Sequence, residues 1–210
     1  MKRIEKVMEA LVKNNMEAYY AERREDIAPI VKTLVSEGAA VAVSGSVSLS
    51  ECGVTDMLRN GKYKFLDRHR PGLRQGEAEK IFMETFSADT YITCVDAVTE
   101  NGELFSAEGN SERAAALSYG TKSVIVIIGR NKIVSNAKEA AIKTKAACTP
   151  KNLQNRACKA LCNGKNCCAS DDKLICCAYS AKMRCSHVIL GYQQKKDRIK
   201  VVISGENMGF

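Results

Sequence analysis

Short apolar runs alternate with amphipathic segments along most of the sequence, and this alternation limits the possible fold more than any other feature. The runs AAVAV (39–43), DTYITC (89–94) and SVIVII (123–128) have the length and composition of buried strands. Strands that alternate with helices form parallel sheets with helices on both faces. The sequence therefore predicts an α/β fold, three-layered around a mostly parallel sheet.

Helices are predicted where apolar residues recur three and four positions apart. This spacing marks six segments, at residues 2–13, 23–36, 48–59, 76–86, 110–118 and 136–147. Gly38 supplies a left-handed stop for the second helix. Asn136 and Glu139 have the spacing of a variant capping box at the start of the sixth.

Three further extended features complete the predicted sheet structure. Asn101-Gly102 lies between two extended arms, which is a strong hairpin signal. Segments 187–193 and 198–204 are predicted as closing strands, antiparallel to each other across a turn at 194–197.

The length of 210 residues suits a single domain, which is expected to span residues 1–210. No apolar stretch reaches the roughly 18–20 residues that a membrane helix needs. The amino-terminal segment MKRIEKVMEALVKNN is too charged for the apolar core of a signal peptide. A cytoplasmic protein with no membrane association is therefore expected.

Positive charge is concentrated in the carboxy-terminal part. Residues 1–130 contain 17 Lys/Arg and 19 Asp/Glu, whereas residues 131–200 contain 15 and 4. A basic half is compatible with nucleic-acid binding. However, only Tyr179 and Tyr192 are aromatic in that half, so few side chains are available to stack on bases. The composition disfavours a nucleic-acid partner and favours a charged face that either serves solubility or binds an anionic ligand.

A Cys-rich excursion is predicted within the domain at residues 148–185. It contains eight of the ten cysteines: Cys148, Cys158, Cys162, Cys167, Cys168, Cys176, Cys177 and Cys185. In a reducing compartment, clustered thiols bind metal or take part in redox chemistry more often than they form disulfides. The first candidates for metal ligands are Cys162, Cys167, Cys168 and Cys176. Structural zinc, an iron–sulfur cluster or redox thiols, and unligated thiols all remain open, because the spacing fits neither a ferredoxin nor a zinc ribbon. The isolated Cys52 and Cys94 are predicted to be core residues.

Common catalytic signatures are missing from the sequence. It has no Walker-type phosphate loop, no dinucleotide-binding glycine fingerprint and no serine-hydrolase elbow. Of its two histidines, His187 is predicted to be structural and His69 is predicted to be exposed. A serine–histidine triad is therefore disfavoured.

Four motifs in fixed order carry a family resemblance. They are SGSVSLSECG (44–53), DAVTENGEL (96–104), EGNSER (108–113) and IGRNKIV (128–134). In this order and spacing they resemble the lactate-utilisation (LUD) domain family over nearly the whole chain. The resemblance implies the NagB/RpiA/CoA transferase-like fold, shared with glucosamine-phosphate deaminases, ribose-phosphate isomerases and CoA transferases. It also implies a link to oxidation of L-lactate to pyruvate, alongside iron–sulfur partner proteins.

A ligand site is predicted at the carboxyl ends of the parallel strands, where such sheets place their ligands. The loop after 39–43 would contribute serine hydroxyls and a glycine whose backbone a ligand can approach closely. Later segments of the chain would contribute positive charge. The candidate ligand-binding residues are Ser44, Gly45, Ser46, Ser48, Ser50, Arg113, Arg130 and Lys132. The alternative is that these serines only cap a helix after a tight turn.

Glu100 is the first candidate for a catalytic residue, and Glu51 and Glu103 are weaker alternatives. CoA transferases of the implied fold use a glutamate in a similar Glu-Asn-Gly context as nucleophile, whereas the structural alternative is a hairpin turn with Glu100 facing water. Three hypotheses follow. The chain binds a small anionic organic acid in lactate utilisation, transfers acyl or CoA groups through Glu100, or docks an iron–sulfur partner without catalysis.

Overall fold

The computed structural model describes residues 1–74, 76–109, 111–144 and 186–209. The predicted Cys-rich excursion and its four candidate metal ligands lie outside these ranges. None of the helices in the described ranges combines the length and apolar character needed to cross a bilayer.

The main sheet has six parallel strands in the order β1-β10-β7-β4-β2-β3. The strands are β1 (Glu17–Ala21), β2 (Ala40–Val43), β3 (Lys64–Leu66), β4 (Thr90–Thr93), β7 (Ser123–Gly129) and β10 (Ile199–Ser204). The predicted α/β class and mostly parallel sheet are therefore confirmed.

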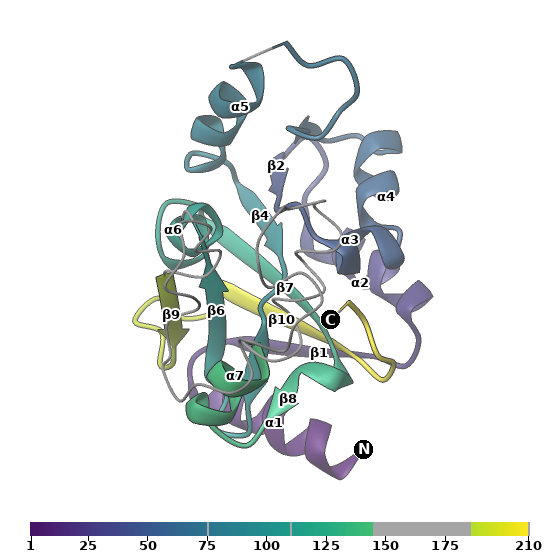
Figure 1. Ribbon diagram of the computed structural model, residues 1–210. Helices are drawn as coiled ribbons and strands as arrows, with labels where there is room; N and C mark the ends of the chain where they lie inside the picture. Colours follow the sequence, from purple (N-terminus) through teal and green to yellow (C-terminus); the bar gives the residue numbers. More distant parts are fainter. Residues whose placement is uncertain (75, 110, 145–185, 210) are drawn as a thin grey trace, which may run out of the picture.

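Helices cover both faces of this sheet (Figure 1). One face packs against α1 (Lys2–Lys13) and α6 (Glu112–Ser118), the other against α2 (Ile27–Leu34), α3 (Val47–Glu51) and α4 (Val54–Asn60). The alternation of side chains along a strand explains this arrangement, because Val124, Val126 and Ile128 point to the first core and Ile125 and Ile127 to the second. Two 3-10 turns, η1 (Arg24–Asp26) and η2 (Arg130–Lys132), and α5 (Glu77–Thr85) complete this part.

A smaller, mixed sheet extends the first core. Its order is β8 (Ile133–Val134), β5 (Ala97–Thr99), β6 (Leu104–Glu108), β9 (Ser186–Leu190). Strands β5 and β6 form the predicted antiparallel hairpin, and Gly102 in its turn has φ +75°. Helix α7 (Ala137–Lys143) packs on the outer face of this sheet, through alanines in a separate apolar cluster.

The predicted pairing of the last two strands is wrong. Strand β9 pairs with β6 in the small sheet, whereas β10 runs parallel to and between β1 and β7 in the main sheet. The physical reason lies in the composition of β10, which buries Val201 and Ile203 in one core and Val202 in the other. A strand that is apolar on both faces suits the centre of a parallel sheet better than a half-exposed hairpin.

Two helix predictions need adjustment. The helix expected at 48–59 is split into α3 and α4, because Gly53 takes a left-handed conformation with φ +70°. At the start of α7, one of the two hydrogen bonds of the predicted capping box is formed. The Asn136 side chain accepts the Glu139 amide at 3.0 Å, but the Glu139 carboxylate accepts the amide of Ser135.

Candidate functional site

Three loops meet at the carboxyl ends of β2, β4 and β7, which are neighbours in the main sheet. The Ser44 amide donates to the Ile92 carbonyl at 3.0 Å, and Thr93 Oγ1 donates to Ser44 Oγ at 3.0 Å. Both hydroxyl-bearing side chains are buried. The loop after β2 is therefore attached directly to the end of β4.

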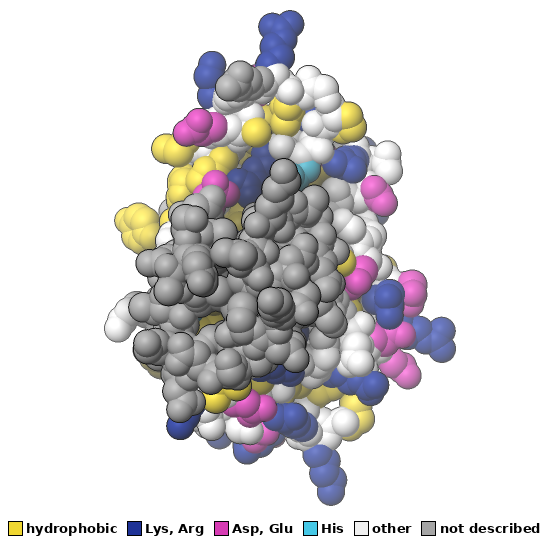
Figure 2. Space-filling view, in the orientation of Figure 1, with side chains coloured by type: hydrophobic (Ala, Val, Ile, Leu, Met, Phe, Trp, Pro, Cys, Tyr) yellow, Lys and Arg dark blue, Asp and Glu magenta, His cyan; other side chains and the backbone are white. Residues whose placement is uncertain are grey.

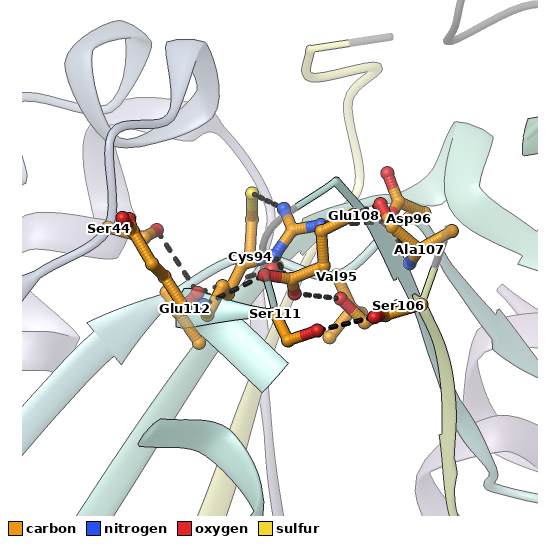
Figure 3. A network of polar contacts seen from close by, with 12 residues as sticks. Ser44, Cys94, Val95, Asp96, Ser106, Ala107, Glu108, Ser111 and Glu112 are labelled. Carbon is orange, nitrogen blue, oxygen red and sulfur yellow. Dashed lines mark hydrogen bonds and ion pairs between the residues drawn. The ribbon is translucent and has the colours of Figure 1, made fainter. Parts of the chain in front are cut away.

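Cys94 lies at the centre of this junction (Figure 3). Its Sγ is 2.8 Å from Ser46 Oγ and 3.9 Å from Arg113 Nη1. The thiol is buried, as predicted, and so is Cys52. Sequence reasoning nevertheless missed that Cys94 belongs to the candidate site. Cys94 is the last residue of a predicted strand, DTYITC (89–94), and an isolated thiol in a strand is usually a core residue.

Arg113, near the start of α6, is held by two acidic side chains. Its Nη2 is 2.9 Å from Asp96 Oδ2 and its Nε is 3.1 Å from Glu108 Oε1. Glu108 also accepts the Arg113 amide at 2.8 Å, and Ser106 Oγ donates to the same carboxylate. Glu108 and Asp96 already bind Nε and Nη2 of the guanidinium. The predicted clamp of Arg113 on a ligand carboxylate therefore stays a prediction, and it would have to use Nη1.

The acidic neighbours also fix the protonation of this arginine. Burial would lower the pKa of Arg113, but the charges of Asp96, Cys94 and Glu108 oppose it and raise that pKa above its ordinary value. Sequence reasoning missed Asp96 and Glu108 as site residues. They stand at the ends of the two hairpin strands, which brings them to one side of Arg113.

Lys132 is buried, with only 5% of its surface exposed. Its Nζ donates to the Val95 carbonyl at 3.1 Å. In the described part of the chain, no carboxylate lies within ion-pair distance of this ammonium. The site therefore contains a desolvated positive charge whose partner is a neutral carbonyl.

The segment after β10 lies beside Lys132 and α3, which it contacts through Gly209. A Cβ on Gly209 would lie 2.5 Å from Ser48 Oγ and 3.6 Å from Lys132 Nζ. Asn131 Oδ1 accepts the Met208 amide at 2.9 Å, and Glu51 accepts the Gly209 amide at 2.9 Å. Ser48 and Lys132 thus face the same short stretch of backbone.

Three predicted residues make none of the contacts described at this junction. Ser50 is exposed, and Arg130 is exposed with its Nε 3.3 Å from Asn207 Oδ1. Glu100 lies against α1, where its carboxylate pairs with Arg3 at 2.8 Å and Lys6 at 2.7 Å. Hydrogen bonds from Lys6 and Arg3 lower the pKa of Glu100. The structure does not bring Glu100 together with the serines and Cys94.

His69 is exposed, as the sequence predicted, and its ring lies close to Gly45 in the loop after β2. A Cβ at Gly45 would lie 3.0 Å from His69 Cε1 and Nε2, so a larger residue there would make the imidazole shift. The neighbouring Arg68 donates to Glu112 at 2.8 Å and stacks on Phe82 at 5.0 Å from the ring centroid. The loop after β3 is thereby tied to α6 and α5 beside the site.

Replacing His69 with glutamine should weaken the pH dependence of stability between about pH 7.5 and 5. Burial and then the charge of Arg68 lower the pKa of His69 from its ordinary 6.5. The unfolded state therefore binds the proton more readily, so stability is lost as pH falls through 6.5 towards the lower folded pKa. Urea midpoints at the two pH values should fall further for the wild type than for the variant. Equal falls would contradict this.

No group of three or more His, Cys, Asp or Glu side chains suited to a metal occurs within the described ranges. The zinc and iron–sulfur expectations concern Cys162, Cys167, Cys168 and Cys176, which lie outside those ranges, and they stay predictions.

Comparison with known proteins places the chain within a protein family. The model of the LUD domain matches residues 4–203. Among solved structures, a DUF162 family protein from Deinococcus radiodurans matches with a TM-score of 0.56 at 12% identity, covering 97% of both chains. Ribose 5-phosphate isomerase A from Methanocaldococcus jannaschii has a TM-score of 0.39 at 16% identity, covering 55% of this chain and 56% of that one. No curated protein matches significantly.

Proposed function

The chain belongs to the LUD domain family, which confirms the resemblance seen in its motifs, and from this premise we propose that it binds a small anionic organic acid. The proposed site is the junction of the loops after β2, β4 and β7. The proposed role is in L-lactate utilisation, through oxidation to pyruvate or a closely related step.

The buried ammonium of Lys132 carries this proposal. Removing a charge from water costs several kcal/mol unless an opposite charge or several hydrogen bonds compensate for it. Within the described ranges, the Val95 carbonyl is the single hydrogen-bond partner of Lys132 Nζ. A carboxylate would supply both the missing negative charge and further acceptor oxygens.

The surrounding groups support a polar, hydroxylated ligand. Ser46 Oγ and Cys94 Sγ are within hydrogen-bond distance of each other, and Ser48 Oγ faces the same backbone segment as Lys132. Hydroxyl groups both donate and accept, so they suit a ligand that carries a hydroxyl or a keto oxygen next to its carboxylate. Arg113 contributes less charge, because Asp96 and Glu108 already neutralise it.

Calorimetric titration with L-lactate and with pyruvate tests the proposal. The Lys132→Met variant should bind each of them at least about 10-fold more weakly, because one charge-assisted contact is lost. The neutral amide lactamide should bind the wild type more weakly than lactate. If wild type and variant bind with equal affinity, or if lactate and lactamide do, then this site does not bind the ligand's carboxylate.

Two control variants make the result specific. Lys138 is exposed on α7, and its change to methionine removes the same charge from the surface without affecting the junction. Glu100→Gln removes the candidate nucleophile of acyl or CoA transfer. Both variants should bind lactate as the wild type does.

The alternatives are supported less directly. Acyl or CoA transfer would use the Glu100 carboxylate as a nucleophile, but this carboxylate is already paired with Arg3 and Lys6. Docking of an iron–sulfur partner would use the Cys-rich segment at 148–185, outside the described ranges.

A further inference from the structure

The Cys94 thiol is in contact with two hydrogen-bond donors from separate elements. Ser46 Oγ, in the loop after β2, is 2.8 Å from Cys94 Sγ, and Arg113 Nη1, on α6, is 3.9 Å from it. Sulfur is a weak acceptor and the contact with Nη1 is long, so neither donor gains much from the thiol. Within the described ranges, the other nitrogens of Arg113 bind two carboxylates and a carbonyl, whereas Nη1 contacts only this sulfur. Both donors can therefore bind an oxygen atom placed beside Cys94.

The positive charges at this point are removed from water. Acidic and basic side chains on the surface are intermixed (Figure 2), and water and salt screen their charges. By contrast, the side chain of Arg113 is 20% exposed and Lys132 is 5% exposed. Hydrogen bonds and charges act more strongly in such surroundings than in water. Negative charge that develops on an oxygen beside Cys94 would therefore be stabilised by groups that are already in place.

This combination of groups suits addition of a thiol to a carbonyl group. The sulfur of Cys94 is the nucleophile, and the donors lie where the carbonyl oxygen would become negatively charged. The ammonium of Lys132 lies near the same end of β4, because it donates to the carbonyl of Val95, the residue that follows Cys94. An acid whose carboxylate binds Lys132, and whose carbonyl is next to that carboxylate, would present its carbonyl carbon on the side of Cys94.

We propose that Cys94 adds reversibly to the carbonyl carbon of a bound 2-oxo acid such as pyruvate. A bond forms between Sγ and the carbonyl carbon, and the π electron pair of the carbonyl moves to its oxygen. The proton of the thiol ends on that oxygen, for which Ser46 Oγ, in contact with Sγ, is a relay. The product is a hemithioketal, and no oxidant or other reactant takes part. This inference rests on the proposed function and deepens it, because a 2-hydroxy acid such as lactate cannot form the adduct.

Carbon NMR of the full chain with pyruvate labelled at carbon 2 tests the proposal. A phosphine has to serve as the reductant, because a free thiol would itself add to pyruvate. The wild type should show a protein-bound tetrahedral carbon in addition to the carbonyl signal of free pyruvate. Cys94→Ala should lose this signal, whereas Cys52→Ala, which removes the other buried thiol of the described ranges, should keep it. A signal that persists in Cys94→Ala would place the adduct elsewhere and overturn the proposal.

Alkylation by iodoacetamide gives a second test that reads Cys94 directly. Cys94 and Cys52 lie in separate tryptic peptides, 81–113 and 33–59, and each is the single cysteine of its peptide. At equal saturation, pyruvate should slow labelling of Cys94 more than lactate does, because lactate has the carboxylate but no carbonyl. Labelling of Cys52 should be the same with either ligand. Equal protection of Cys94 by both ligands, or a Cys94 that iodoacetamide does not reach without ligand, would contradict the adduct.

Calorimetric titration separates a failure of this inference from a failure of the proposed function. Cys94→Ala should weaken binding of pyruvate at least about fivefold more than binding of lactate. An equal loss for both ligands would indicate a merely structural role of Cys94 and overturn the inference. If pyruvate binds through Lys132 but no tetrahedral carbon appears, the inference fails and the proposed function stands. If neither pyruvate nor lactate binds the wild type, both fail.

Discussion

Replacing Arg113 with methionine is expected to lower the free energy of unfolding by about 3–5 kcal/mol. The side chains of Asp96 and Glu108 are only 7% and 10% exposed, and both pair with this guanidinium. Methionine fills similar space but removes the cation that these two largely buried carboxylates share. The penalty therefore comes mainly from the loss of that positive charge, as is usual when one partner of a buried pair is removed. Urea unfolding at neutral pH measures the change.

Two companion variants separate this cause from a general loss of packing. Arg130→Met removes an exposed arginine and should change stability by no more than about 0.5 kcal/mol. Adding Asp96→Asn and Glu108→Gln to Arg113→Met should restore part of the lost stability, because neutral amides tolerate burial better than carboxylates. A loss below about 1 kcal/mol in the single variant would mean that water already reaches this cluster.

Replacing Gly102 with alanine should destabilise the protein by about 2–4 kcal/mol, through two effects that add. The residue has φ +75°, which a Cβ disfavours. In addition, the new Cβ would lie 2.6 Å from the Ala10 carbonyl carbon and 2.7 Å from the Leu11 nitrogen, both in the backbone of α1. A helix backbone cannot move aside as the end of a flexible side chain can. Chemical denaturation again supplies the measurement.

Gly38 offers a matched control for this variant. It has φ +78°, but a Cβ there meets nothing within 4 Å. Gly38→Ala should therefore cost only the conformational part, about 1 kcal/mol. If the two variants lose equal stability, the hairpin does not press on α1 as closely as the structure shows.

The sequence predicted the main sheet well where composition alone determines the structure. Strand β7 has β-branched residues at five of the first six positions, and such a segment has few alternatives to a buried strand. The hairpin at Asn101-Gly102 was equally well determined, because its turn requires a positive φ. The pairing of β10 was not predictable in this way, since its partners β1 and β7 are far away in the chain. Composition does not state which strands become neighbours.

The candidate site was predictable only in part, for a related reason. The loop from Ser44 to Ser48 and the cation Lys132 could be predicted, because each follows a recognisable strand. Cys94 gave no signal of its own, since an isolated thiol in an apolar strand is usually a core residue. The ion pairs that hold Arg113 depend on the hairpin strands carrying Asp96 and Glu108 to the same place. Such convergence is a property of the folded chain.

The placement of β10 has a consequence for how the protein is made. This strand is the last of the six in chain order, yet it lies between β1 and β7. Its Val202 is in register with Tyr19 of β1 on one side and with Ile127 of β7 on the other. During synthesis the nascent chain therefore exposes the edges of β1 and β7, separated by the width of a missing strand, until residue 204 has left the ribosome. Folding of the main sheet consequently has to wait for β10 and requires closure of very long loops, which slows it. The interval before closure is the period in which chaperones would be most useful to this protein.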